Sequence, residues 1–187
     1  MSLRPAVFLD RDGTLHRELE RAPRTFAELE FVSGLDAALG ALASAGYVLV
    51  VVTNQSAVAS GEIGVAELDA LSRALRERFP IAACYVCPHH PERGAPPYVR
   101  SCTCRKPSSG MLALACAELG LDPTRSWIVG DARRDLEAGL ALGTRAILVR
   151  TGKGERERAT LSPELASRVT VVDDVVAAAR VVLAQGK

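Results

Sequence analysis

The sequence predicts an α/β fold: a Rossmann-like three-layer sandwich whose central parallel sheet lies between two layers of helices. Three observations lead to this prediction. Short apolar runs, as expected for buried strands, alternate with longer stretches of helical periodicity. Glycines follow several of the helical stretches, and polar clusters directly follow several of the strands. Such alternation is typical of βαβ units, in which the strands are parallel and helices cover both faces.

The expected strands and helices follow one another along the whole chain. In order, we expect a strand at 6–10, a helix at 35–45, a strand at 47–52, a helix at 65–79, a strand at 82–87, a helix at 109–120, a strand at 126–130, a helix at 134–142, a strand at 145–149 and a last helix from about 173. Gly46, Gly120 and Gly143 each follow a helical stretch, where a left-handed residue often ends a helix. Residues 15–33 and 88–108 are irregular, and irregular segments of this length are usually functional.

Length and composition restrict the class of protein. A chain of 187 residues, 48% of them hydrophobic, suits one well-buried domain, so residues 1–187 are expected to form a single domain. The formal net charge is +1, which creates no overall field that attracts nucleic acid or an anionic membrane. Apolar stretches such as residues 47–52 are far shorter than the ~18 residues of a membrane span, and the first strand begins too early to follow a cleavable signal. We therefore expect a cytoplasmic protein without a nucleic-acid or membrane partner.

Two carboxylates stand directly after the first expected strand, in the pentapeptide Asp10-Arg11-Asp12-Gly13-Thr14. Ligands of open α/β sheets bind at the carboxyl ends of the strands. Two carboxylates this close repel each other unless a divalent cation lies between them or one of them keeps a proton. The pentapeptide therefore indicates a reaction centre or a metal site, with an ordinary polar turn after a strand as the simpler alternative.

Other polar groups are expected at the same edge of the sheet. They are Thr53-Asn54-Gln55-Ser56 after the second strand, Gly130-Asp131 with Asp135 after the fourth strand, and Arg105-Lys106-Pro107 before a helix. Taken singly, each cluster is also compatible with a polar turn or a helix start. Because the carboxyl ends of parallel strands lie along one edge, these residues are expected to converge on one ligand.

Lys106 is an exception to the composition of this chain. Only three lysines, Lys106, Lys153 and Lys187, stand among 23 cationic side chains, and the rest are arginines. A compact ammonium acts as a point charge against one phosphate oxygen, whereas a guanidinium spans two, so the two residues exchange poorly at a crowded site. A lysine at this position therefore indicates a specific requirement, with an ordinary surface lysine as the alternative.

In order and spacing, these residues resemble the four motifs of the haloacid dehalogenase superfamily of phosphatases. The resemblance runs from residue 5 to about 152 and rests on Asp10-x-Asp12-Gly13-Thr14, Thr53, Lys106, and Asp131 with Asp135. Within the superfamily, residues 51–56, 87–91 and 102–107 are similar to the D-glycero-D-manno-heptose 1,7-bisphosphate 7-phosphatases, and to the related histidinol-phosphate phosphatases. No inserted cap domain is expected between the motifs.

The resemblance implies Mg²⁺-dependent hydrolysis of a phosphomonoester through an aspartyl-phosphate intermediate. Asp10 would be the nucleophile, and Asp12 the general acid and then the general base. Mg²⁺ would be held by the Asp10 side chain, the Asp12 backbone carbonyl and Asp131. Thr53 and Lys106 would balance the charge of the transferring phosphoryl group.

Further roles follow from the same resemblance. Asp135 is expected behind the metal ligands, and the expected substrate contacts are Arg11, Asn54, Gln55, Ser56 and Arg105. The preferred substrate is heptose 1,7-bisphosphate, with histidinol phosphate or another small sugar phosphate as the alternative. Arg17, Arg21 and Arg24 are expected as solvated surface charges, with contact to a second phosphate as the alternative. We expect a monomer or weak oligomer, and the sequence assigns no role to the tail beyond residue 153.

A second cluster gathers cysteine and histidine within residues 87–104. Cys87-x-His89, followed after twelve residues by Cys102-x-Cys104, supplies three thiolates and one imidazole, a closed tetrahedral set suited to structural Zn²⁺. His89 is preferred to His90 because the family pattern uses the first of the pair. Reduced core thiols or a disulfide are the alternatives, but a cytoplasmic setting disfavours the disulfide and the prolines of this loop disfavour a packed core. Zinc would then pin the loop beside the active site.

Two other classes of protein fit the sequence less well. A phosphoacceptor signalling module would carry its acceptor after the third strand, where this chain has Val86-Cys87. A zinc-stabilised nucleic-acid module would show a basic face with interleaved aromatic residues, but only 4% of the residues are aromatic. The sequence therefore favours an enzyme that acts on a small phosphorylated metabolite.

Overall fold

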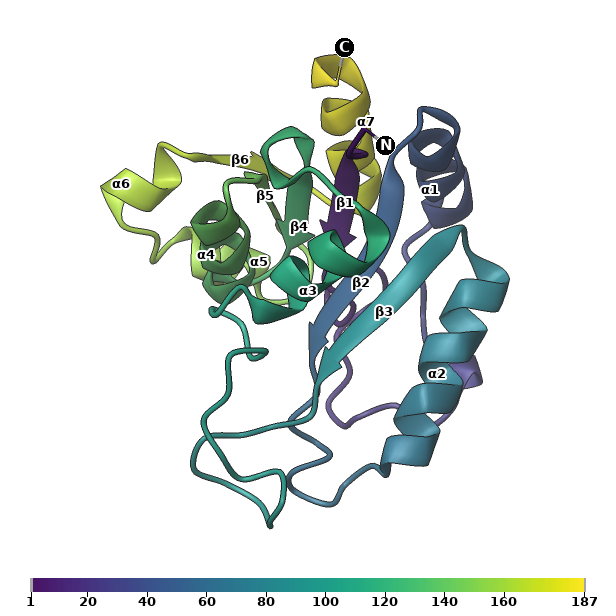
Figure 1. Ribbon diagram of the computed structural model, residues 1–187, viewed down its shortest axis with the longest axis vertical. Coiled ribbons are helices and arrows are strands. Elements are labelled where there is room, and N and C mark those ends of the chain that lie inside the picture. The colour runs from purple at the N-terminus through teal and green to yellow at the C-terminus, as the bar shows by residue number, and fades with distance from the viewer. Residues whose placement is uncertain (1, 187) are drawn as a thin grey trace.

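Six parallel strands form the central sheet of the structure, a computed structural model that describes residues 2–186 (Figure 1). The strands are β1 (Ala6–Leu9), β2 (Val48–Asn54), β3 (Ile81–Cys87), β4 (Trp127–Gly130), β5 (Arg145–Val149) and β6 (Val169–Val172). They lie in the order β3-β2-β1-β4-β5-β6. The chain therefore builds outward from β1 to β3 and then returns to the other side of β1, which opens a crevice between the carboxyl ends of β1 and β4.

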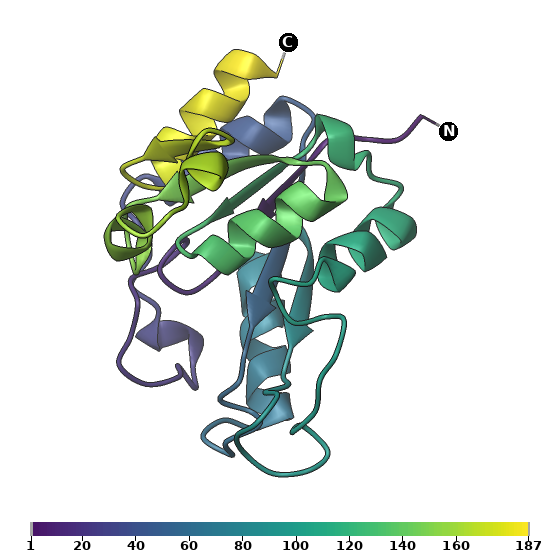
Figure 2. The ribbon, with the colours of Figure 1, turned by 90° about the vertical axis from the view of Figure 1, so that its left-hand side faces the viewer.

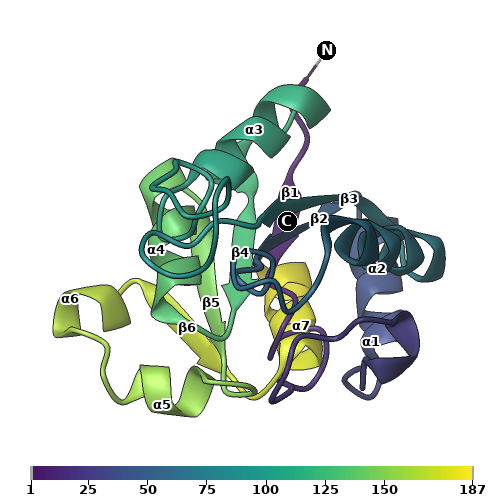
Figure 3. The same ribbon diagram turned by 90° about the horizontal axis from the view of Figure 1, so that it is seen from below.

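Helices cover both faces of the sheet (Figure 3). They are α1 (Leu35–Ser44), α2 (Val65–Arg78), α3 (Gly110–Leu119), α4 (Arg133–Leu142), α5 (Gly154–Arg158), α6 (Pro163–Ala166) and α7 (Val175–Gln185), with 3-10 turns at Phe26–Glu28 and Pro123–Arg125. Successive strand residues point to opposite faces. In β1, Val7 and Leu9 pack into the core under α1, α2 and α7, whereas Ala6 and Phe8 pack into the core under α3 and α4. Burial on both faces explains why the central strands are continuous apolar runs.

The predicted three-layer architecture is confirmed, and the predicted elements lie within a few residues of the observed ones. Gly46, Gly120 and Gly143 have φ angles of 91°, 63° and 92°, the left-handed conformation expected after a helix. Within the described residues, helices and loops join the strands and no cap domain is inserted. None of these helices is long and apolar enough to cross a membrane.

The sequence analysis missed the elements between β5 and the last helix. Strand β6 is the edge strand beside β5, and its four residues are mostly half-buried, so it lacks the buried apolar run that marks the central strands. Helices α5 and α6 have five and four residues, too few to show helical periodicity. The last helix begins at Val175, because the Asp174 side chain accepts a hydrogen bond from the Ala177 N–H at 2.8 Å and caps it.

Two long loops extend beyond the carboxyl edge of the sheet. The β1–α1 loop (residues 10–34) contains the first 3-10 turn, and the β3–α3 loop (residues 88–109) reaches far below the ends of β2 and β3 (Figures 1 and 2). These loops are the two irregular segments that the sequence marked as functional. Residues of both loops help to line the cleft at this edge.

Candidate functional site

A cleft of about 470 Å³ lies at the carboxyl edge of the sheet. Its wall is built from the end of β2, from the loops that follow β1, β2, β3 and β5, and from the start of α4. The predicted site residues that line it are Asp10, Asp12, Thr53, Asn54, Gln55, Ser56 and Arg105. The topology therefore brings side chains from distant parts of the sequence to one place, as expected for a parallel sheet.

Lys106 lies fully buried beneath the cleft, where its ammonium contacts three oxygens. Its Nζ is 2.8 Å from Asp10 Oδ1, 2.7 Å from Asp135 Oδ1 and 2.6 Å from the Val52 carbonyl oxygen. The contacts to Asp10 and Val52 are hydrogen bonds, and the contact to Asp135 is a close ion pair. Burial alone would lower the pKa of Lys106, but the carboxylates of Asp10 and Asp135 raise it, so the side chain is charged.

Asn54 holds the backbone of Lys106 in place. Its side-chain Nδ2 donates to the Lys106 carbonyl oxygen at 3.0 Å, and its Oδ1 accepts from the Lys106 N–H at 3.1 Å. The sequence predicted a substrate contact for Asn54, but the structure shows that its amide is engaged with the backbone of another site residue. Asn54 thus ties the end of β2 to the β3–α3 loop and positions the buried ammonium.

Three buried carboxylates gather beside Lys106. Oxygen atoms of Asp10, Asp131 and Asp135 all lie within 4.8 Å of one another. Asp131 accepts a hydrogen bond from the Lys153 N–H at 2.8 Å through Oδ2, but its Oδ1 is buried without a partner. Burial and the nearby charge of Asp10 raise the pKa of Asp131 to about 7. A group of oxygen ligands with an unsatisfied buried atom fits a hard divalent cation such as Mg²⁺.

Glycines make room for Asp131. A Cβ atom would lie 2.3 Å from Asp131 Oδ2 at Gly13 and 2.2 Å from it at Gly152, and both residues have the left-handed φ that glycine adopts freely, 78° and 56°. The Thr151 hydroxyl donates to the Gly13 carbonyl oxygen at 2.6 Å and joins the two turns. The carboxylate therefore sits between two backbone segments that only glycine allows to approach so closely.

Asp12 lies at the cleft, with hydrogen-bond donors around its carboxylate. Gln55 Nε2 donates to its Oδ2 at 2.6 Å, and Thr53 Oγ1 is 3.4 Å from the same atom. Burial would raise the pKa of Asp12, but the Arg11 guanidinium and the His16 imidazole hold it well below its usual range. The carboxyl group is therefore ionised in the free protein.

Arg11 occupies a different place from the one predicted. Its guanidinium is buried and binds the Asp12 carboxylate through Nη2 at 3.0 Å and Nε at 3.2 Å. Its side chain does not line the cleft, and the predicted substrate contact at this position stays a prediction. The sequence shows that residue 11 is an arginine, but it does not show that the arginine side chain points toward Asp12.

Some residues of the site carry no signal that sequence analysis could use. His16 is fully buried, with Nε2 3.2 Å from Asp12 Oδ1 and Nδ1 2.7 Å from the Arg17 carbonyl oxygen. Lys153, one of the three lysines of the chain and given no role by the sequence analysis, borders the cleft and forms an ion pair with Glu18. Both stand in irregular segments where no periodicity or spacing marks them.

Cys87, at the end of β3, comes together with His89, Cys102 and Cys104 of the β3–α3 loop. The Sγ of Cys104 is 3.2 Å from the Sγ atoms of Cys87 and Cys102 and 3.3 Å from His89 Nδ1. Cys87 Sγ is 3.6 Å from both Cys102 Sγ and His89 Nδ1. Ligands about 2.3 Å from a central Zn²⁺ in a tetrahedron are roughly 3.8 Å apart, so these spacings fit a slightly contracted zinc site.

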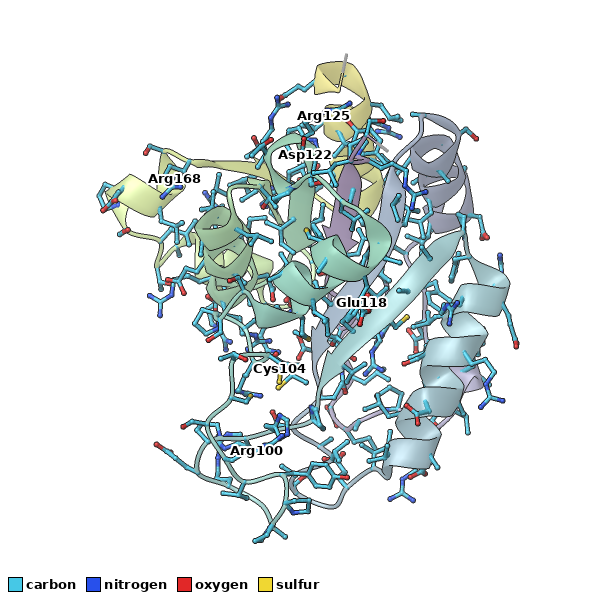
Figure 4. All side chains as sticks on the ribbon, viewed as in Figure 1. Arg100, Cys104, Glu118, Asp122, Arg125 and Arg168 are labelled. Atoms are coloured by element: carbon cyan, nitrogen blue, oxygen red, sulfur yellow. The ribbon has the colours of Figure 1, made fainter. Side chains whose placement is uncertain are left out.

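The chemistry of these four groups also fits a metal. Burial lowers the pKa of His89, so the imidazole is neutral, as a ligand must be. Burial raises the pKa of the Cys87 thiol, and a bound cation would offset that effect. His90 lies outside the cluster, because its Nδ1 accepts the backbone N–H groups of Glu92 and Arg93. Figure 4 shows Cys104 just beyond the lower end of β3, between the sheet and the rest of the loop.

The loop arginines have protein partners. Arg17 pairs with Glu30 at 3.5 Å, and Arg21 pairs with Glu28 at 3.0 Å while also bordering the cleft. Arg24 Nη2 donates to the Glu62 carbonyl oxygen at 3.0 Å. These contacts agree with the expectation of surface charges for Arg17 and Arg24, and they place Arg21 at the rim.

The site combines a buried aspartate–lysine pair with a cluster of carboxylates, and it lies at the carboxyl edge of a Rossmann-like sheet between β1 and β4. This is the arrangement of a haloacid dehalogenase-type hydrolase. A family model described as HAD-hydrolase-like matches residues 103–178. The chain is 35% identical to the D-glycero-beta-D-manno-heptose-1,7-bisphosphate 7-phosphatase of Pseudomonas putida, over 93% of this chain and 97% of that protein. It is 39% identical to the enzyme of the same name from Escherichia coli, over 80% and 81% of the two chains.

Solved structures agree with these relationships. The crystal structure of D,D-heptose 1,7-bisphosphate phosphatase from B. bronchiseptica, complexed with magnesium and phosphate, has a TM-score of 0.81 and 31% identity, and the match covers 99% of both chains. A putative HAD-like phosphatase from Mesorhizobium loti has a TM-score of 0.78 and 30% identity, over 97% of this chain and 88% of that one. The chain therefore belongs to the heptose bisphosphate phosphatase family of the haloacid dehalogenase superfamily, and it is a phosphatase.

Proposed function

We propose that this phosphatase removes the 7-phosphate of D-glycero-D-manno-heptose 1,7-bisphosphate in a Mg²⁺-dependent reaction through an aspartyl phosphate. The observation that carries the mechanism is the position of Asp10, a buried carboxylate at the cleft with one oxygen held 2.8 Å from Lys106 Nζ. The choice of substrate is supported by the relatives, which carry this activity in their names and align over most of the chain.

Asp10 is the nucleophile of the proposed reaction. One carboxylate oxygen attacks phosphorus, the bond from phosphorus to the sugar oxygen breaks, and the phosphoryl group is left on Asp10. Lys106 orients the carboxylate and offsets its charge, while the Thr53 hydroxyl lies close enough to the cleft to donate to a phosphoryl oxygen. Mg²⁺ bound by Asp10, Asp131 and the Asp12 backbone carbonyl would supply further positive charge to the phosphoryl oxygens.

Asp12 is the general acid and base of the proposed reaction. It donates a proton to the departing sugar oxygen, and its carboxylate later accepts a proton from the water that hydrolyses the aspartyl phosphate. Arg11 and Gln55 hold the carboxylate in one orientation. The pKa of Asp12 is low in the free protein, and the arrival of an anionic phosphate next to it raises that pKa toward the value a proton donor needs.

We propose that residues at the rim of the cleft bind the part of the substrate that is remote from the transferred phosphate. Arg105 Nη1 donates to Ser56 Oγ at 2.9 Å and to the His89 carbonyl oxygen at 2.8 Å, which fixes its guanidinium at the cleft wall. Arg105 still has unused N–H donors for a distal phosphate or hydroxyl. The partner is thus a small phosphorylated metabolite, and we propose that the protein handles it as a monomer or weak oligomer.

Kinetics on a substrate panel test the proposed substrate. We expect kcat/KM for heptose 1,7-bisphosphate to exceed that for histidinol phosphate and for common sugar monophosphates by at least about a hundredfold, because the site pairs with groups that poor substrates lack. The measurement is phosphate release with Mg²⁺ present, and with Mg²⁺ removed by a chelator as the control. Equal or higher kcat/KM for histidinol phosphate would contradict the assignment.

We also propose that Cys87, at the end of β3, and the three ligands of the β3–α3 loop hold a structural Zn²⁺. Four protein ligands leave no open position for water, so the metal does no chemistry itself. It holds the loop that carries Arg105 and Lys106, and the Cys104–Arg105–Lys106 sequence links the two sites directly. Reduced thiolates at such a site are consistent with the cytoplasmic location that we propose.

Metal content tests the zinc site. Protein purified without chelator is expected to contain about one equivalent of zinc, and Cys104→Ser is expected to lose it and to unfold at a lower temperature, because a structural site contributes folding free energy. Cys116→Ser is the matched control, since this half-buried thiol on α3 lies outside the cluster. Less than half an equivalent of zinc in the unaltered protein would contradict the proposal.

A further inference from the structure

Arg134 places a guanidinium in the wall of the cleft, although no sequence motif singles it out. It is the second residue of α4, directly before Asp135, and it borders the cleft together with Asp10 and Lys153. Its Nε is buried without a hydrogen-bond partner, and no ion pair within 4.0 Å joins its side chain to any residue in the range 2–186. The side chain therefore brings a positive charge to the cleft that the protein itself does not neutralise by contact.

The neighbouring cations are engaged in a way that Arg134 is not. Lys106 contacts Asp10 and Asp135, Lys153 pairs with Glu18, and Arg105 donates to Ser56 and the backbone. The preceding residue in the chain, Arg133, is exposed and its Nε lies 3.5 Å from Glu137 Oε1 on the same helix. A buried donor without a protein partner is costly, so a water, an ion or a ligand usually completes it, and an arginine at the wall of this cleft is placed to be completed by an anion.

The charges around the reaction centre call for another cation. The carboxylates of Asp10, Asp131 and Asp135 outnumber the single ammonium of Lys106, and a bound Mg²⁺ would only balance them. A phosphomonoester arrives as a dianion near neutral pH, so its charge must be met by cations outside this balanced group. Arg105 and Arg134 both border the cleft without an ion pair to a carboxylate among residues 2–186, and Arg134 lies beside Asp135. Burial would lower the pKa of the Arg134 guanidinium, but Asp135 and Asp10 raise it, so the group stays charged.

We propose that the Arg134 guanidinium binds an oxygen of the phosphoryl group that is transferred to Asp10. This inference rests on the proposed phosphatase mechanism and adds a residue to it. Arginine suits the task because its planar N–H groups match phosphate oxygens and its charge is permanent. In this arrangement the phosphoryl group lies between Lys106 and Thr53 on one side and Arg134 on the other.

Binding of inorganic phosphate tests the proposal without turnover. We would measure the Kd of orthophosphate by calorimetry in the presence of Mg²⁺ for the unaltered protein and for Arg134→Met, Arg134→Lys and Arg133→Met. Arg134→Met is expected to weaken binding about 10- to 100-fold, as the loss of a charge-assisted hydrogen bond implies. Arg134→Lys should recover part of the loss. Arg133→Met, the exposed neighbour, should stay within about twofold.

Kinetics give a second, independent result. Arg134→Met should lower kcat/KM by a similar factor on heptose 1,7-bisphosphate and on a simple monophosphate such as an aryl phosphate, because both contain the transferred group. A loss confined to the bisphosphate would assign Arg134 to the distal phosphate and overturn the proposal. Unchanged orthophosphate affinity would overturn it too, whatever the change in thermal stability. If heptose bisphosphate proves a poor substrate while phosphate binding depends on Arg134, the proposed substrate fails and this inference stands.

Discussion

Replacing Asp10 by asparagine is expected to lower kcat by at least about a thousandfold, because the amide cannot form the covalent intermediate on which the reaction depends. The substitution changes few other contacts. The amide oxygen can still accept a hydrogen bond from Lys106, which retains Asp135 and the Val52 carbonyl as partners. The measurement is steady-state phosphate release with Mg²⁺ on heptose 1,7-bisphosphate and on an aryl phosphate.

A matched control separates chemistry from general damage in this experiment. Asp69 is an exposed residue of α2 that does not line the cleft, and Asp69→Asn is expected to retain full activity. Phosphate release by Asp10→Asn within tenfold of the unaltered protein, after removal of contaminating phosphatases, would show that another group is the nucleophile.

Lys106→Met is expected to have the largest combined effect on stability and activity. It leaves the buried carboxylates of Asp10 and Asp135 without their shared cation, and loss of one partner from a buried ion pair costs about 3–5 kcal/mol in the free energy of unfolding. We expect kcat/KM to fall at least about a hundredfold, because the cation also balances the charge of the phosphoryl group. Denaturant unfolding and phosphate release measure the two effects separately.

Lys106→Arg tests whether the position requires lysine or only a positive charge. The ammonium is surrounded by Asp10, Asp135 and the Val52 carbonyl at 2.6–2.8 Å, which leaves no room for the larger guanidinium. We therefore expect this variant to lose most of the activity as well. Arg168→Met, at an exposed position, is the control for both variants. A fully active Lys106→Arg would contradict the proposed role of the compact ammonium.

The sequence was enough to predict the architecture and the location of the site, for a physical reason. Strands buried on both faces are continuous apolar runs, and parallel strands bring their carboxyl ends to one edge. Asp10, Thr53 and Asp131 could therefore be placed together without coordinates. Edge strand β6 escaped prediction because it is short and only half-buried.

The directions of the side chains could not be predicted in the same way. Arg11 turns toward Asp12, and Asn54 binds the Lys106 backbone, because local donors and acceptors compete with the ligand for these groups. The role proposed for Arg134 depends on burial and on the lack of a partner. Both are properties of the folded chain and leave no pattern in the sequence.

A crystal structure with Mg²⁺ and beryllium trifluoride, which mimics a phosphoryl group on a carboxylate, tests the central claim most directly. We predict the trifluoride on a carboxylate oxygen of Asp10, with Lys106 and Arg134 as its cationic neighbours. We predict Mg²⁺ between Asp10 and Asp131, at the oxygen that is buried without a partner. A trifluoride attached to another residue, or a metal ion remote from Asp131, would contradict the account.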